Sequence, residues 1–151
     1  MSWDLIVFDF EDAQSDPESG TAVFPDGWDP PAMGSGDEIR RKISAVLPGV
    51  DWSEPAFGHL LGADFSLEFN LREKEPISSF SIYARGQATA TVLKLMSATR
   101  WRMLDVSTTT WLHHAPDPDF GRAQYQALLD RALETRATTK KRSLLQRLLG
   151  R

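Results

Sequence analysis

Three carboxylate residues, Asp9, Glu11 and Asp12, follow directly after an apolar segment near the start of the chain. Carboxylate oxygens are the ligands that Mg²⁺ and Ca²⁺ prefer, and the end of a strand is a common place for such a group. No lysine or second acidic pair elsewhere stands in a context that would complete an active site. We therefore interpret these residues as solvated loop carboxylates, with a metal-dependent enzyme or a small-ligand binder as the alternative, and we predict no metal and no cofactor.

His59, Ser66 and Glu68 are the residue types of a hydrolase site. A hairpin that turns at Gly62-Ala63 would place His59 opposite Ser66 and close to Glu68, on the outward face of a sheet. A nucleophilic serine also needs a sharp turn that exposes its oxygen and nearby amides that form an oxyanion hole. Ser66 lies in the middle of a predicted strand, so we expect a polar surface here and assign no catalytic residue.

Two adjacent histidines, His113 and His114, precede Asp117 and Asp119. In a strand the two side chains would point to opposite faces, whereas in a loop they could share a metal with one of the aspartates. Two loop histidines without a metal are the favoured interpretation.

The chain is rich in tryptophan, with five residues at positions 3, 28, 52, 101 and 111. Most of them fit core or edge packing in which the indole N–H is hydrogen-bonded. Trp28 and Trp52 lie in segments rich in proline and glycine, and they are the two that could be exposed anchors for a partner.

The elements that would position these residues follow from hydrophobic periodicity. Period-two alternation predicts strands, and apolar residues at helical spacing predict helices. A capping box at Ser35 to Glu38 marks the start of the first helix, and Pro48-Gly49 ends it. The predicted strands are 3–10, 57–61, 64–71, 77–85 and 101–107, and the predicted helices are 37–47 and 87–99. The order β-α-β-β-β-α-β predicts an α+β fold, an antiparallel-rich sheet with helices on one face.

Charge divides the chain into two predicted parts, an acidic α+β domain over residues 1–115 and a basic helical tail over 116–151. Residues 1–119 hold nine Lys/Arg against nineteen Asp/Glu, a net charge of −10, whereas residues 120–151 hold eight against two, a net charge of +6. The chain has no cysteine, which excludes disulfides and thiolate sites. The first ten residues do not resemble a signal peptide, so a cytoplasmic location is expected.

Apolar residues at helical spacing in the tail predict amphipathic helices with a basic polar face. Its expected contact residues are Lys140, Lys141, Arg142, Leu144, Leu145, Leu148 and Leu149. They could lie on an anionic membrane, contact nucleic-acid phosphates or pack into an acidic partner. Docking on the chain's own acidic domain, or on a second copy in a homodimer, is the favoured role.

Several segments, in this order, resemble a group of small, uncharacterised bacterial proteins: MSWDLIVFDF, LPGVDWSEPAFG, FSLEFNL, SFSIYARG and WRMLDVSTTTWL. The resemblance covers roughly residues 1–112 by its motifs. Phe57 stands where the group often has tryptophan, and Arg100 and Thr109 stand where it often has glycine. The resemblance implies an α+β fold and a bacterial origin, and it supplies no catalytic residues. In size and architecture the chain is also similar to immunity proteins of bacterial toxin systems.

These features favour a non-enzymatic protein-binding module, of which a toxin-immunity protein is one concrete version. The expected partner is another protein, such as a toxin or a secretion component, and an acidic surface would suit one with a basic site. The predicted binding surface is the outward sheet face, formed by Glu68, Asn70, Ser79, Ser81, Tyr83 and Arg85, with Trp28 and Trp52 as anchors.

Overall fold

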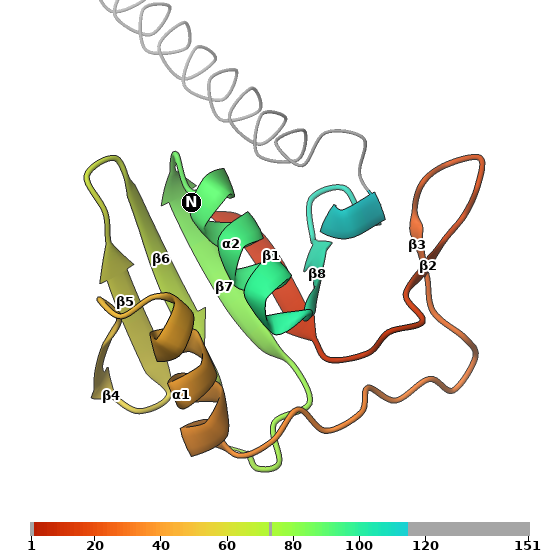
Figure 1. The fold of residues 1–151 in the computed structure, drawn as a ribbon. Coiled ribbons are helices and arrows are strands. Elements are labelled where there is room, and N and C mark those ends of the chain that lie inside the picture. Colours follow the sequence, from red (N-terminus) through yellow and green to blue (C-terminus); the bar gives the residue numbers. More distant parts are fainter. Residues whose placement is uncertain (1, 73, 115–151) are drawn as a thin grey trace, which may run out of the picture.

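The computed structural model describes residues 2–72 and 74–114 of the chain. The predicted basic tail, with its amphipathic helices and its contact residues, lies outside the described residues. Within them the dominant feature is one antiparallel sheet of seven strands (Figure 1), in the order β4-β5-β6-β7-β1-β8-β9. Its strands are β1 (Trp3–Phe8), β4 (Asp51–Glu54), β5 (Phe57–Leu61), β6 (Phe65–Asn70), β7 (Phe80–Gly86), β8 (Arg102–Asp105) and β9 (Thr110–Trp111).

Two helices, α1 (Gly36–Val46) and α2 (Thr89–Thr99), lie on the same side of this sheet (Figure 1). The predicted α+β class and the predicted order of the longer elements are therefore confirmed. Four short strands were not predicted: β4, β9 and the separate two-stranded pair β2 (Gln14–Ser15) and β3 (Ala22–Val23). A short 3₁₀ helix, Leu112–His114, ends the described residues.

The main core forms between the helices and the facing side of the sheet. Strand residues alternate between the two faces, so every second side chain of β6, β7 and β1 points toward the helices. Those side chains are almost fully buried against apolar residues of both helices: Leu67, Phe69, Phe80, Ile82, Leu5 and Val7 from the strands, and Ile39, Ile43, Val92 and Leu95 from the helices. This packing fixes the strands relative to one another, so the side chains on the opposite face of the sheet also have fixed positions.

Helix α1 begins as its capping residues predict. The Ser35 side chain accepts a hydrogen bond of 3.2 Å from the Glu38 backbone N–H, which satisfies one of the free amides at the helix start. A second free amide, that of Gly36, donates to a carboxylate oxygen of Glu75 at 2.8 Å. The loop between β6 and β7 therefore fixes the N-terminus of α1.

A second, smaller core covers one end of the opposite sheet face. Phe8, Leu104 and Trp111 are buried there, and partly buried Phe10 and Trp28 pack against them. The cover comes from the segment between β1 and α1, which includes the β2–β3 pair. The aromatic side chains of this segment account for its fixed position on the sheet.

Among the described residues, no helix combines the length and the apolar character that crossing a membrane requires.

Candidate functional site

The sheet face opposite the helices carries a row of polar side chains that crosses five strands. Neighbouring members of the row are paired in register: Asp51 with His59, His59 with Glu68, Glu68 with Tyr83, and Tyr83 with Asp4. Asp51 and His59 are exposed, and the other three are half-buried. We call these five residues the polar row.

The polar row contains two of the six residues that were predicted on the outward face, Glu68 and Tyr83. Two further pairs flank it on the same face, Asn70 opposite Ser81 and Ser66 opposite Arg85. Ser79 lies just before β7 and is half-buried. The structure therefore brings together Glu68, Asn70, Ser81, Tyr83 and Arg85 on two adjacent strands.

The predicted register of the β5–β6 hairpin was wrong by two positions. His59 lies opposite Glu68, and Ser66 lies opposite Leu61. The reason is a longer turn than predicted, because residues 62–64 all lie outside the strands and the Gly62 N–H donates to the Phe65 carbonyl at 2.8 Å. His59 and Ser66 are not cross-strand partners, which removes the geometric basis of the hydrolase interpretation.

Asp51 joins the polar row through β4, the edge strand that was not predicted. Its carboxylate accepts hydrogen bonds from the Ser53 hydroxyl at 2.5 Å and the Ser53 backbone N–H at 2.8 Å. These bonds, with a smaller contribution from His59, hold the pKa of Asp51 below its usual value. Asp51 therefore stays ionised at neutral pH. An aspartate two residues before a serine was the available sequence signal for these local hydrogen bonds.

Trp52 is half-buried and packs inside the fold, so its indole is less exposed than the hypothesis of a partner anchor assumed. Its indole N–H donates to the Ser44 hydroxyl at 2.9 Å, and its ring lies 5.9 Å from the ring of Phe69. Gly58 leaves room for the indole, since an added Cβ there would approach the ring to 2.6 Å. Trp28 is half-buried as well, and the edge-on contact of its ring with Phe8 has a centroid distance of 5.5 Å.

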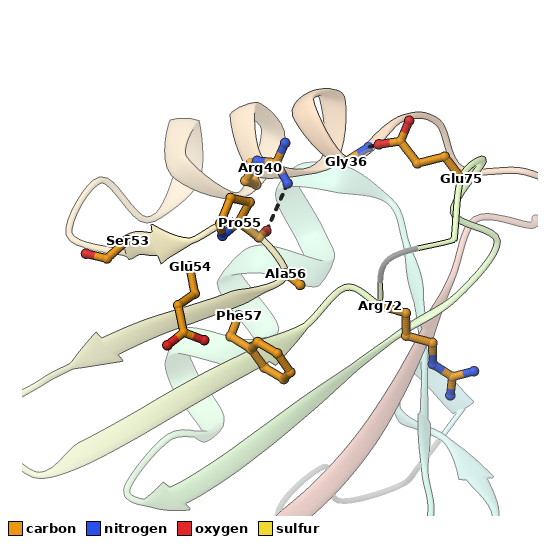
Figure 2. Close-up of a pocket in the computed structure, with 9 residues that line it drawn as sticks. All are labelled: Gly36, Arg40, Ser53, Glu54, Pro55, Ala56, Phe57, Arg72 and Glu75. Carbon is orange, nitrogen blue, oxygen red and sulfur yellow. Dashed lines mark hydrogen bonds between the residues drawn. The ribbon is translucent and has the colours of Figure 1, made fainter.

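A cavity of about 460 Å³ lies between the N-terminus of α1 and the β4–β5 hairpin (Figure 2). Two of its charged residues have partners in the chain: Arg40 donates to the Pro55 carbonyl at 2.9 Å and contacts Asp37, and Glu75 accepts from the Gly36 N–H. Figure 2 shows the Arg72 side chain directed away from Arg40, so the two guanidinium groups do not converge. The arrangement braces the helix against the hairpin.

The predicted metal alternatives gain no geometric support in the described part of the chain, which contains no group of three or more His, Cys, Asp or Glu residues able to hold a metal. Asp9, Glu11 and Asp12 are all exposed after the end of β1. His113 and His114 lie in the 3₁₀ helix with ring centroids 4.0 Å apart, and His114 Nδ1 is 2.8 Å from the Ser15 hydroxyl. Asp117 and Asp119 lie outside the described residues.

Comparison with known proteins gives no match to a family model, a curated protein or a solved structure.

Proposed function

We propose that the chain is a non-enzymatic protein-binding module that recognises a basic partner through the open face of its sheet. The single observation that carries this proposal is the polar row. Its five side chains lie in register across β4, β5, β6, β7 and β1, and none of them is buried. A toxin-immunity protein that masks the basic site of a toxin is one concrete version of this function.

The composition of this face supports protein recognition. Carboxylates stand at the two ends and the middle of the row, as Asp51, Asp4 and Glu68, with His59 and Tyr83 between them. Tyrosine supplies rigid contact area with a polar end, which is why it is enriched at interfaces. Carboxylates spaced along neighbouring strands give a complementary field to a basic partner and speed its association.

The rigidity of the strands also supports the proposal. The helix-facing neighbours of the row, such as Leu67, Phe69 and Ile82, are at most 2% exposed. Because their packing fixes the strands, the outward side chains reach a partner with little ordering cost, which favours affinity. A rigid surface of this kind suits a stable complex with a protein partner.

The experiment is a pull-down from the native host with the tagged full chain and with the double variant Glu68→Lys and Tyr83→Ala. We expect a stoichiometric partner with the wild type and its loss with the double variant, because both changes remove contacts and one reverses a charge. Glu38→Lys is the control variant, since Glu38 is an exposed acid on the helical side of the molecule. It makes the same change in net charge and should retain the partner.

Two results would contradict the proposal. Recovery of no stoichiometric partner by the wild type would remove the evidence for a binding function. Equal recovery by the wild type and the double variant would show that the partner binds elsewhere on the molecule.

A further inference from the structure

The segment between β1 and α1 concentrates negative charge. Residues 9–34 contain seven Asp/Glu residues and no Lys or Arg, and all seven carboxylates are exposed. Such a segment repels itself and attracts cations over about 10 Å at moderate salt. Charge alone does not define a site, but this segment also packs on an aromatic cluster and contains a cavity.

An aromatic floor lies beneath the segment. Trp111 is fully buried, and the rings of Phe8, Phe10 and Phe24 lie 5.5 to 5.8 Å from it between centroids. Trp28 contacts the same three phenylalanines at 5.0 to 5.5 Å. The Trp111 indole N–H also donates to the Gln14 carbonyl at 3.1 Å, which ties β2 to the sheet. The floor is therefore held in place from two sides.

A cavity of about 270 Å³ opens in this segment. Its walls combine apolar and aromatic side chains with one carboxylate and one amide: Phe10, Asp12, Gln14, Val23, Pro25 and Trp28. Val23 and Phe24 are large apolar residues that stay 42% and 38% exposed, so the surroundings of the opening are apolar as well. The cavity lies below the usual size range of a small-molecule site, which favours a smaller occupant such as one side chain.

We propose that this cavity binds one cationic side chain, arginine in preference to lysine, presented by the partner protein. Trp28 and Asp12 line the same cavity, and an aromatic ring together with a carboxylate is the pair of groups that a guanidinium recognises. The guanidinium stacks on a ring and donates to a carboxylate at once, which ammonium does less well. The carboxylate of Asp12, and the excess of acids over Lys and Arg in residues 9–34, disfavour an anionic occupant.

This inference rests on the proposed function and names the kind of residue by which the partner is held. The cavity and the polar row are on the same side of the sheet, because the second core that carries Trp28 packs on the face opposite the helices. A partner that covers the polar row is therefore on the correct side of the molecule to insert a side chain into the cavity.

The test measures binding of a short probe to the full chain by the NMR shift of the Trp28 indole N–H, assigned with Trp28→Phe. The probes are acetyl-Gly-Arg-Gly-amide, its lysine analogue and its citrulline analogue, which is neutral and nearly isosteric with arginine. We expect saturable millimolar binding of the arginine probe, weaker binding of the lysine probe and none of the citrulline probe. Raising the salt concentration should weaken the binding.

Two variants separate the cavity from the general charge. Asp12→Asn removes the carboxylate that lines the cavity and should weaken the arginine probe about tenfold, the effect of losing one charge-assisted hydrogen bond. Glu11→Gln removes an exposed neighbouring charge that does not line the cavity and should leave the affinity nearly unchanged. Equal effects of the two variants would show that only the overall charge matters and would overturn the proposal.

Other outcomes also decide the question. Equal binding of the citrulline and arginine probes would overturn the proposal. The absence of any Trp28 response in the intact chain would overturn it too, and this includes a cavity that the chain's own basic tail occupies. The proposed function can fail separately: a probe that binds as expected while no partner is recovered would contradict the function alone. A partner lost with the polar-row variant, together with a silent probe, would contradict the cavity alone.

Discussion

The indole N–H of Trp3 donates a hydrogen bond of 2.9 Å to the carboxylate of Asp105, a residue 102 positions later in the chain. Asp105 is 1% exposed, and its other carboxylate oxygen accepts from the backbone N–H and the hydroxyl of Ser107 at 2.9 and 2.6 Å. The carboxylate therefore joins the start of β1 to the turn that follows β8. Both oxygens of this buried carboxylate are satisfied, as its burial requires.

Replacing Asp105 with alanine should lower the free energy of unfolding by about 2–4 kcal/mol, because the buried Trp3 N–H loses its acceptor and the turn loses two hydrogen bonds. Urea denaturation at neutral pH measures the change. Asp51→Ala is the matched control, since Asp51 makes the same two bonds to Ser53 but is exposed. A loss of stability as large in Asp51→Ala as in Asp105→Ala would contradict the assigned role of burial.

Gly86 at the end of β7 has a φ of +71°, and an added Cβ would lie 2.2 Å from the Asp64 carbonyl oxygen. Gly86→Ala should therefore destabilise the fold by about 2 kcal/mol or more, through a clash with backbone in addition to an unfavourable φ. Gly20→Ala isolates the second contribution, because Gly20 has a φ of +73° with nothing within 4 Å of the added atom. Thermal or urea denaturation of the two variants should show the smaller loss, about 1 kcal/mol, for Gly20→Ala. Similar losses in both would show that the close approach at Gly86 relaxes without cost.

Thr109 adopts a φ of +53° in the turn before β9, a conformation that β-branched residues rarely take. The turn nevertheless forms, and the Thr109 carbonyl accepts from the Ala22 N–H at 2.7 Å, which links the turn to β3. Thr109→Gly should raise the free energy of unfolding by about 0.5–1 kcal/mol, because relief of the strain exceeds the added entropy of the unfolded chain. Thr109→Ala keeps a Cβ and should give less than half of that gain. A melting temperature unchanged in the glycine variant would mean that the turn carries no strain.

The longer elements could be predicted from the sequence because their signals are local. Ser35 and Glu38 mark the start of α1 within four residues, and the alternation Leu67, Phe69, Leu71 assigns a buried face to β6 without knowledge of its neighbours. Six outward residues were chosen from the alternation of β6 and β7, and five of them lie together on these two paired strands. Local patterns determine which face of the sheet a residue occupies, so this part of the candidate site could be predicted from the sequence.

Contacts between distant residues could not be predicted in this way. β4 has only Trp52 as a partly buried residue and a register shift between Asp51 and Glu54, so it shows no clean alternation. The aromatic floor depends on residues near positions 10, 28 and 111, whose pairing appears in no local window. The predicted register of the β5–β6 hairpin was wrong because the register depends on the number of turn residues. The composition around Gly62 does not determine that number.

His113 lies at the end of the described residues with its ring 6.2 Å from Trp111 and 4.0 Å from His114 between centroids. Burial, followed by repulsion from the positive charges of His114 and Arg102, lowers the pKa of His113 from 6.5 to about 4. Its buried Nδ1 makes no hydrogen bond to any of the described residues. The folded protein therefore holds this imidazole neutral at pH values at which it would be charged in the unfolded chain.

The sign of the pH effect follows from that difference. Between pH 6.5 and about 4 the unfolded chain binds a proton at His113 that the folded chain does not, so the contribution of His113 to stability is complete above pH 6.5 and is lost as the pH falls. We expect the urea midpoint of the wild type to fall between pH 7 and pH 5, and the fall to be smaller in His113→Gln. His114→Gln removes the neighbouring charge and should reduce the fall only in part, since burial is the larger cause. An equal fall in the wild type and His113→Gln would show that other groups carry the pH dependence.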